Sequence, residues 1–334
     1  MMDYKTLLKE LKAREFKPIY FLQGEEAYFI DEIAKELEQN VLEEHEKDFN
    51  QTIFYGKDAT TDAILEAAKR YPMMAERQVI IVREAQHLKK HLDDFKDYLE
   101  KPLDSTILVF CYKYGKLDGR TEIAKLFAKT CLFNSPALKD YDVPNWVANH
   151  IQLKGFKIDQ KTAVLISDYL GNNLQKIAGE VEKLALVVKP GESISPTIIQ
   201  KHIGLSKDYN PFELQDALLK RDVLKANKII NYFAKNPKDN PDVFVIAILF
   251  GLFQKLMKIH FSKNKNNDSA LAKEIKTHPF FIKQYKQALN FYSPKRLAYI
   301  ISLLRNADQQ AKGIGKETNP PGELLKQLVF QILH

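Results

Sequence analysis

A run of valine and isoleucine at residues 79–82 constrains the fold more than any other feature of this sequence. Such a continuous run is typical of a strand that is buried on both faces of a parallel sheet. Pro72 is expected to end the helix before this strand, because a proline disfavours the α conformation of the preceding residue. The sequence therefore places a parallel sheet at the centre of the first part of the chain.

Two adjacent methionines, Met73 and Met74, are expected in the turn between that helix and the strand. Turns usually lie at the surface, and methionine is flexible and polarizable enough to suit an adaptable binding surface. The alternative is that both side chains pack under the sheet. Taken by itself, the stretch favours local packing over contact with a partner.

Strands and helices alternate along the first 138 residues. Strands are expected at 18–23, 50–55, 79–82, 106–111 and 130–133. Helices are expected at 6–11, 28–41, 60–68, 87–99 and 120–129. This alternation predicts an α/β domain with a parallel, doubly wound sheet and helices on both of its faces.

Helical patterns continue without strands after residue 138. A first group is expected at 143–153, 159–170, 174–188 and 195–202, and the polar stretch 206–211 is expected to be a linker. Further helices are expected at 212–220, 222–234, 241–260, 269–276, 279–290, 294–311 and 322–333. We therefore expect three domains: an α/β domain at 1–138, a small all-α domain at 139–206 and an all-α C-terminal domain at 207–334.

The net charge of +7 is unevenly distributed along the chain. Residues 211–334 contain 20 Lys and Arg against 10 Asp and Glu, whereas residues 1–210 contain 30 against 33. Residues 251–296 alone carry ten basic and two acidic side chains. This distribution fits a C-terminal module that faces an anion such as nucleic acid, and it fits a solvated, lysine-rich surface equally well.

Cysteine content and hydropathy indicate the environment of the chain. Cys111 and Cys131, its two cysteines, lie in apolar, strand-like runs, which is typical of a reduced intracellular protein. The first residues open an amphipathic helix and lack the apolar core of a signal peptide. The longest apolar run, at 243–253, has eleven residues, whereas a membrane-spanning helix needs about 20. We expect a cytoplasmic protein that does not span a membrane.

The turn after the first strand is the place where a phosphate-binding loop would lie. Such a loop needs several glycines, a lysine for the phosphates and a Ser or Thr for magnesium. The turn here contains Gly24, Glu25 and Glu26, with no lysine or hydroxyl, and its carboxylates would repel phosphate. Arg83 and Glu84 follow the third strand, so an acidic pair for magnesium is missing as well. The order of strands and helices indicates a nucleotide-binding fold, but the residues that bind phosphate and magnesium are missing. No cofactor is therefore expected.

One group of side chains has the spacing of a metal site. Glu84, His87 and His91 would share one face of a helix at three- and four-residue spacing. No cysteine or fourth ligand is close in sequence, and lysines occupy the same face, so a solvated surface is the simpler interpretation. No nucleophile–base pattern stands out either, so we expect neither a metal site nor catalytic residues.

Several stretches, in a fixed order, give the chain a resemblance to a known family. They are 18–28, with the Gly24 turn; 73–82, with Met73, Met74 and Arg77; Lys116-Leu117-Asp118-Gly119-Arg120; 180–184; and Ala307-Asp308-Gln309-Gln310-Ala311-Lys312-Gly313. Each stretch is weak alone. The ordered set extends over nearly the whole chain and resembles the delta subunit of the bacterial DNA polymerase III clamp loader.

This resemblance implies a fold and a role. It implies an AAA+-like N-terminal domain with a degenerate nucleotide site, followed by a small helical lid and a helical collar that joins subunits. Delta subunits bind the ring-shaped sliding clamp and help to hold one interface open, so that the clamp can be loaded on primed DNA during replication. Sister subunits of the gamma/tau and delta-prime type handle ATP. The resemblance therefore implies no catalysis by this chain itself, although it would belong to the DNA polymerase III holoenzyme.

The resemblance also implies where the clamp is bound. In delta subunits, two adjacent hydrophobic residues before the third strand insert into a pocket on the clamp, and Met73 and Met74 occupy that place. The family often has an aromatic residue at the second position, so Met74 departs from its pattern.

Primer–template DNA is a further expected partner, because the C-terminal region is basic. The candidate residues for contact with DNA are Lys255, Lys258, Lys263, Lys265, Lys283 and Lys286. The collar of the family mainly joins subunits, so these lysines face either DNA or a sister subunit. Two alternatives to a loader subunit remain: an active AAA+ ATPase of DNA metabolism, and a DNA-binding adaptor unrelated to clamp loading.

Overall fold

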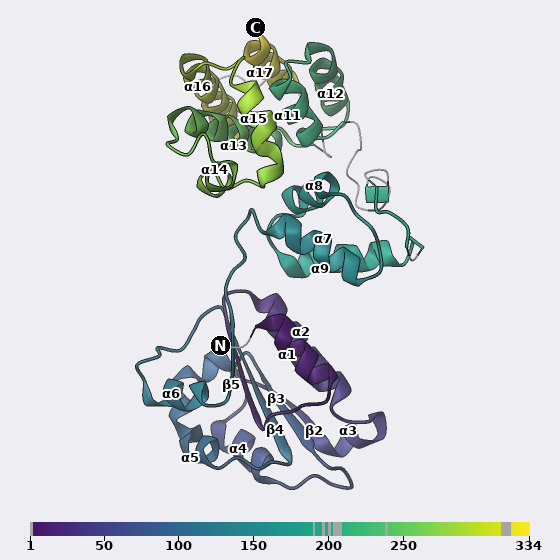
Figure 1. Ribbon diagram of the computed structural model, residues 1–334, viewed down its shortest axis with the longest axis vertical. Coiled ribbons are helices and arrows are strands. Elements are labelled where there is room, and N and C mark those ends of the chain that lie inside the picture. The colour runs from purple at the N-terminus through teal and green to yellow at the C-terminus, as the bar shows by residue number, and fades with distance from the viewer. Residues whose placement is uncertain are drawn as a thin grey trace. The chain divides into compact units, whose positions relative to one another are not determined.

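Figure 1 shows the computed structural model of the chain, which divides into two compact units, Met1–Leu138 and Lys139–His334. The structure describes residues 3–189, 191–195, 198–199, 202, 209–237, 240–314 and 322–334. The two units are described separately. The expected helix at 195–202 and the expected linker at 206–211 lie largely outside the described residues. The division of the second unit into a lid and a collar stays a prediction.

The first unit is built on a five-stranded parallel sheet. Its strands are β1 (Ile19–Gly24), β2 (Gln51–Tyr55), β3 (Gln78–Arg83), β4 (Thr106–Lys113) and β5 (Cys131–Ser135). Their order in the sheet is β2-β3-β4-β1-β5, and every neighbouring pair is parallel. The parallel sheet predicted from the alternation of strands and helices is confirmed.

Strand β3 lies inside the sheet and is buried on both faces, as its composition predicts. Ile80 pairs with Thr52 of β2 on one side and with Leu108 of β4 on the other. Val79 and Ile81 pack into the core on one face, whereas Ile80 and Val82 pack into the core on the opposite face. Alternating side chains along one strand thus hold both layers of helices to the sheet.

Helices cover both faces of the sheet (Figure 1). Helices α1 (Tyr4–Lys12) and α2 (Ala27–Asn40) contribute to the core on one face. Helix α4 (Thr61–Lys69), the 3₁₀ helix η1 (Ala85–Phe95), α5 (Lys96–Glu100) and α6 (Glu122–Ala128) contribute to the core on the other. A further short helix, α3 (Glu44–Asn50), precedes β2 and was not expected from the sequence.

The helix expected at 87–99 is present, but it consists of two types of helix. The structure has a 3₁₀ helix up to Phe95 and one short α-helical segment after it. The buried side chains of η1 are Ala85, Leu88, Leu92 and Phe95. Their spacings of three and four residues fit both helix types, so the apolar pattern could not distinguish between them.

The second unit is helical in its described residues, as predicted. Its helices are α7 (Val143–Leu153), α8 (Gln160–Leu170), α9 (Leu174–Ala185), α11 (Pro211–Leu219), α12 (Val223–Lys235), α13 (Asp242–Phe261), α14 (Asp268–Glu274), η2 (Pro279–Phe281), α15 (Ile282–Ala288), α16 (Pro294–Ala311) and α17 (Glu323–Leu333). One apolar core joins the helices from α11 to α17. Helices α13 and α16 are its longest members, and they pack against each other.

Helix α13 is longer than the apolar run at 243–253 suggested. With 20 residues it is, by length and composition alone, sufficient to cross a membrane, and among the described residues it is the one helix that is. Its buried side chains, which include Leu249, Phe253 and Leu256, belong to the core of the second unit. Such burial is typical of the central helix of a globular domain, and length and composition alone are weak evidence for a membrane span.

Candidate functional site

The loop between α4 and β3 exposes both methionines to solvent. Met73 is 61% exposed and Met74 is 100% exposed. Tyr71, two residues earlier, is exposed as well. The interpretation that the methionines pack under the sheet is therefore wrong. Two large apolar side chains instead stand next to each other at the surface of the first unit.

The backbone of this loop is tied to α3 by the side chain of Asn50, although both methionine side chains are exposed. The Met73 N–H donates to Oδ1 of Asn50 at 2.6 Å, and Nδ2 of Asn50 donates to the Met73 carbonyl at 2.9 Å. The same Nδ2 also donates to the Glu46 carbonyl within α3, at 3.0 Å. Asn50 itself is only 3% exposed, so its amide group is a buried bridge between α3 and the loop.

A second buried amide, that of Gln78, ties the start of the loop to the sheet. Its Nε2 donates to the Ala67 carbonyl at 3.2 Å, to the Arg70 carbonyl, and to Oγ1 of Thr106 at 2.8 Å. Gln78 is the first residue of β3 and is 4% exposed. The Ala67 carbonyl, which also accepts from the Arg70 N–H, and the Arg70 carbonyl are thus both bonded to the strand that follows the loop.

Met74 has a left-handed backbone conformation, with φ of 54°. A residue with a β-carbon rarely adopts this conformation, because it brings the β-carbon close to the backbone. The surrounding loop therefore has to hold it. The hydrogen bonds of the Asn50 side chain to Met73, those of the Gln78 side chain to the end of α4, and the start of strand β3 at Gln78 supply that constraint.

The Gly24 turn at the end of β1 is closed by the backbone of β5. Gly24 has φ of +147°, and a β-carbon on it would lie 2.0 Å from the Ser135 carbonyl oxygen. The Glu26 N–H donates to the Ser135 carbonyl at 3.1 Å, and Oγ of Ser135 donates to the Glu26 carbonyl at 2.6 Å. This glycine is therefore needed for close approach of two chain segments.

The N-terminus of α2 is already capped by a carboxylate. The Glu26 side chain accepts a hydrogen bond from the Tyr28 N–H at 3.0 Å. Burial raises the pKa of this carboxyl group, and the hydrogen bond from Tyr28 offsets part of the effect. In a phosphate-binding loop the first N–H groups of the helix would point at the phosphate. Here the side chain of Glu26 occupies that position.

The ends of β3 and β4 carry paired charges. Arg83 forms an ion pair with Glu38 of α2 at 2.6 Å, and Lys113 forms one with Asp31 of the same helix at 2.6 Å. Glu84 lies 3.8 Å from His87. His91 is four residues beyond His87, and it does not share a face with it on a 3₁₀ helix, which has three residues per turn. The described residues contain no cluster of three or more His, Cys, Asp or Glu side chains that could hold a metal ion.

The two cysteines form no disulfide and are buried in the strands of the sheet. Burial raises the pKa of the Cys111 thiol to about 12 and that of the Cys131 thiol to about 11. Both therefore remain protonated thiols near neutral pH, and neither has the electropositive, accessible surroundings of a reactive cysteine.

The candidate DNA-contacting lysines fall into two groups. Lys258, Lys263, Lys265 and Lys283 are exposed, on α13, on the loop after it and on α15. Lys286 forms an ion pair with Asp268, and Lys255 is half-buried. The first group is available to an anionic partner, whereas the charge of Lys286 is partly neutralised within the chain.

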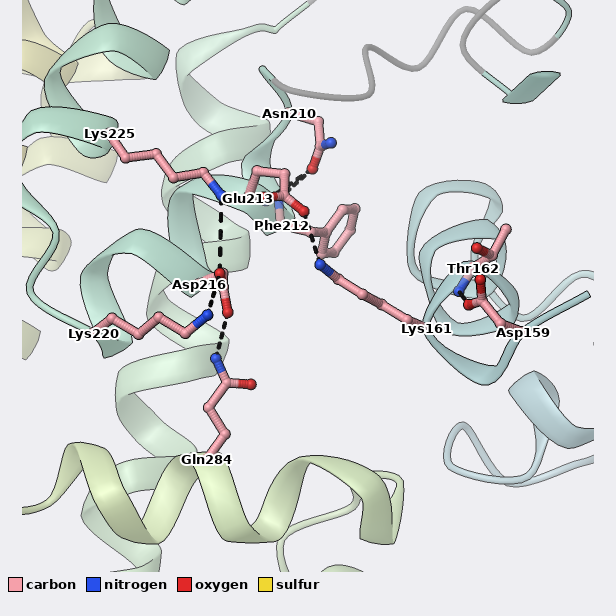
Figure 2. A network of polar contacts seen from close by, with 10 residues as sticks. All are labelled: Asp159, Lys161, Thr162, Asn210, Phe212, Glu213, Asp216, Lys220, Lys225 and Gln284. Atoms are coloured by element: carbon pink, nitrogen blue, oxygen red, sulfur yellow. Dashed lines mark hydrogen bonds and ion pairs between the residues drawn. The ribbon is translucent and has the colours of Figure 1, made fainter. Parts of the chain in front are cut away.

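A polar network connects α8 to α11 in the second unit (Figure 2). Nζ of Lys161 on α8 lies 3.0 Å from Oε1 of Glu213 on α11, and Glu213 pairs with Lys225 of α12 as well. Burial by itself would raise the pKa of the Glu213 carboxyl group, but the two lysines outweigh it and hold the pKa below the usual value. Glu213 therefore keeps its charge while it joins three helices.

The same network continues to α15 through Asp216. Its carboxylate accepts hydrogen bonds from Lys220 at 2.9 Å and from the side-chain amide of Gln284 on α15 (Figure 2). Asn210 caps the N-terminus of α11 by accepting from the N–H groups of Phe212 and Glu213, both at 2.9 Å. Charged and amide side chains thus fix the position of α11 among its neighbours.

Comparison with known proteins identifies relatives along the whole chain. A model of the DNA polymerase III delta subunit matches residues 20–135, and a model of the C-terminal domain of the same subunit matches residues 208–326. The DNA polymerase III subunit delta of Bacillus subtilis (strain 168) is 23% identical over 336 residues, which cover 97% of this chain and 94% of the relative.

A solved structure shares the fold. The Bacillus subtilis DNA clamp loader delta protein superimposes with a TM-score of 0.59 at 23% identity and covers 99% of both chains. The predicted α/β part with a parallel sheet, followed by helical parts, is therefore confirmed. Because two models of one subunit together match most of this sequence in the order of its α/β and helical parts, the chain belongs to the family of DNA polymerase III delta subunits.

Proposed function

We propose that this chain binds a ring-shaped sliding clamp by inserting Met73 and Met74 into a hydrophobic pocket on the ring. The observation that carries the proposal is the complete exposure of Met74 next to the exposed Met73, on a loop whose backbone is held by buried amides. Exposed apolar side chains on a fixed backbone are suited to docking. By holding one interface of the ring open, the subunit would help the loader to place the clamp on primed DNA.

In the proposed assembly, different subunits of the clamp loader have different tasks. ATP is handled by sister subunits, which this chain contacts through residues 207–334. The Gly24 turn, with Glu26 on the first helical N–H groups, supports a purely structural role for this part of the fold. Exposed lysines of α13, its following loop and α15 contact primer–template DNA in the assembled loader, which works in the cytoplasm.

The energy available from the two methionines is sufficient for a strong contact. Full burial of one methionine side chain contributes roughly 1.5–3 kcal/mol, so the pair contributes about 3–6 kcal/mol. Contacts of this size dominate the binding energy of an interface. Since about 1.4 kcal/mol corresponds to a tenfold change in affinity, removal of both side chains should be easy to detect.

The direct test is the double variant Met73→Ala/Met74→Ala. We expect its affinity for the sliding clamp of the same organism to fall roughly a hundredfold or more, about 2.7 kcal/mol. Its melting temperature should change little, because both side chains are exposed. Calorimetry or surface plasmon resonance measures the affinity, and thermal unfolding measures the stability.

A matched control comes from another adjacent pair of exposed apolar side chains. Leu186 and Val187, after α9 in the second unit, are 87% and 53% exposed. The variant Leu186→Ala/Val187→Ala removes similar apolar surface and should leave the affinity for the clamp unchanged. A well-folded Met73→Ala/Met74→Ala variant that binds the clamp as tightly as the wild type would refute the proposal.

A further inference from the structure

We infer that Asn50 is a positioning residue for clamp binding, which it controls without touching the clamp; this inference rests on the proposed function. Asn50 ends α3, a different element from the loop that carries the methionines. It is 3% exposed, so its side chain is not available to a partner. Its amide nevertheless makes both hydrogen bonds that fix the backbone of Met73.

The chemistry of the contact requires an amide side chain. Met73 presents one N–H donor and one carbonyl acceptor to the same side chain, and an amide matches both with an acceptor oxygen and a donor nitrogen in one planar group. The pairing resembles that between two strands, although α3 is a helix. Because the site is buried, loss of the side chain would leave the N–H and the carbonyl of Met73 without these partners, and such buried groups are costly.

Gln78 joins the two ends of the loop that carries the exposed residues. Its Nε2 holds the carbonyls of Ala67 and Arg70 at the end of α4, and β3 anchors it in the sheet. Between these two anchors, Met74 is held in its left-handed conformation. The loop thus has its backbone ordered before any partner arrives, while the methionine side chains remain in solvent.

A loop backbone that is ordered before binding raises the affinity, because a flexible loop would lose conformational freedom when the clamp binds. Ordering of side chains and loops opposes association, and a loop that is already in its bound conformation avoids that cost. Asn50 should therefore affect clamp binding through the loop alone. This property separates positioning by Asn50 from a general contribution to stability.

The first experiment uses the full-length variant Asn50→Ala and the sliding clamp of the same organism. We expect affinity for the clamp to fall about tenfold, and amide hydrogen exchange in peptides covering residues 71–77 to become faster. The variant Asn50→Asp is a second test if Asn50→Ala folds poorly. It keeps the size of the side chain and an acceptor for the Met73 N–H, but it has no donor for the Met73 carbonyl, so affinity should again fall.

A matched control is Gln23→Ala. Gln23 is another buried amide of the first unit, and it accepts from the Leu117 N–H at 2.8 Å and donates to Asn134 at 2.7 Å. Removal of the Gln23 side chain disturbs a different loop, and this side chain is about as buried as that of Asn50. The affinity for the clamp should therefore stay within twofold of the wild type. Equal losses of affinity in Gln23→Ala and Asn50→Ala would mean that general destabilisation is the cause, and would overturn the inference.

A double-mutant cycle separates this inference from the proposed function. If Asn50 acts through the methionines, Asn50→Ala should have almost no further effect on affinity in the Met73→Ala/Met74→Ala background. A full tenfold loss in that background, or none in the wild-type background, would overturn the role of Asn50 and leave the methionine contact standing. If Met73→Ala/Met74→Ala itself binds normally, the proposed function fails and the positioning role fails with it.

Discussion

Gly24 and Glu26 lie where a phosphate-binding loop would be expected, but their contacts are structural. A glycine after the first strand is the usual start of a phosphate-binding loop, but here the backbone of Ser135 requires it. A carboxylate in the next turn would repel phosphate, and it caps the helix instead. Gly24 thus serves the close approach of β5, and Glu26 serves as a helix cap.

The corresponding prediction concerns ATP. We expect the isolated chain to give no saturable heat in calorimetry with ATP and magnesium, because the first N–H groups of α2 are capped by Glu26 and no lysine follows Gly24. Glu26→Ala should also fail to bind, since removal of the carboxylate supplies neither the lysine nor the hydroxyl. Micromolar binding by the wild-type chain would instead support an active ATPase.

The residue scale also shows what the sequence could not predict. The position of Met73 and Met74 follows from local signals, namely a proline after a helix and a run of apolar residues ahead. The function of Asn50 depends on a hydrogen bond to a residue 23 positions later. No local pattern contains that partner, and the sequence alone suggested that residue 50 begins a strand.

Helices and strands with a strong apolar pattern were predicted from the sequence. Helices that depend on tertiary contacts were not. Strands β1, β3 and β4 were found because they are buried on both faces. Helix α3 was missed because its described sequence is mostly charged, and its only buried residue is Asn50. The 3₁₀ helix η1 was given the wrong type, since apolar spacing alone does not define the helix. The element that positions the candidate site was therefore the hardest to anticipate.

The contact between α8 and α11 leads to a prediction about pH. Glu213→Gln should lower the free energy of unfolding by about 1 kcal/mol at pH 7, as expected for a pair of ion pairs that is partly exposed. The pKa of Glu213 is lowered in the folded state. The stabilisation is therefore present above pH 4.5 and is lost as the pH falls through the folded-state pKa, so wild type and variant should converge in acid.

The chain provides its own probe for that measurement. Trp146, the one tryptophan in the sequence, lies in α7 and should report unfolding of the second unit by its fluorescence in urea. Glu323→Gln is the control, because Glu323 pairs with Lys326 across one turn of α17 and both side chains are only partly buried. A constant difference between Glu213→Gln and wild type at all pH values would contradict the assigned role of the charge.

For the whole molecule, the distribution of charge is the dominant feature. The basic residues of 251–296 fall on helices and two loops of the second unit, whereas the candidate clamp contact belongs to the first unit. Four of the candidate lysines are exposed. The sequence predicted the charge of this region, but only the structure separates exposed lysines from Lys286, which is paired with Asp268.

The affinity of the assembled loader for primed DNA should therefore depend less strongly on salt concentration when these lysines are neutralised. We expect Lys258→Gln/Lys263→Gln/Lys265→Gln to reduce the slope of log affinity against log salt concentration by roughly two to three, if each lysine contacts one phosphate. Lys286→Gln should reduce it less. Equal slopes for the triple variant and the wild-type loader would mean that these lysines face solvent or a sister subunit.

The position of β3 inside the sheet has a mechanical consequence for the proposed role of this subunit in holding a ring open. The loop with Met73 and Met74 leads directly into β3, which is hydrogen-bonded to β2 on one side and to β4 on the other. A pull on the loop along the strand would have to shear two ladders at once, and the evenly spaced bonds of a parallel sheet share such a load. An edge strand could be peeled away one bond at a time, whereas β3 would transmit the force to the whole sheet before it yielded.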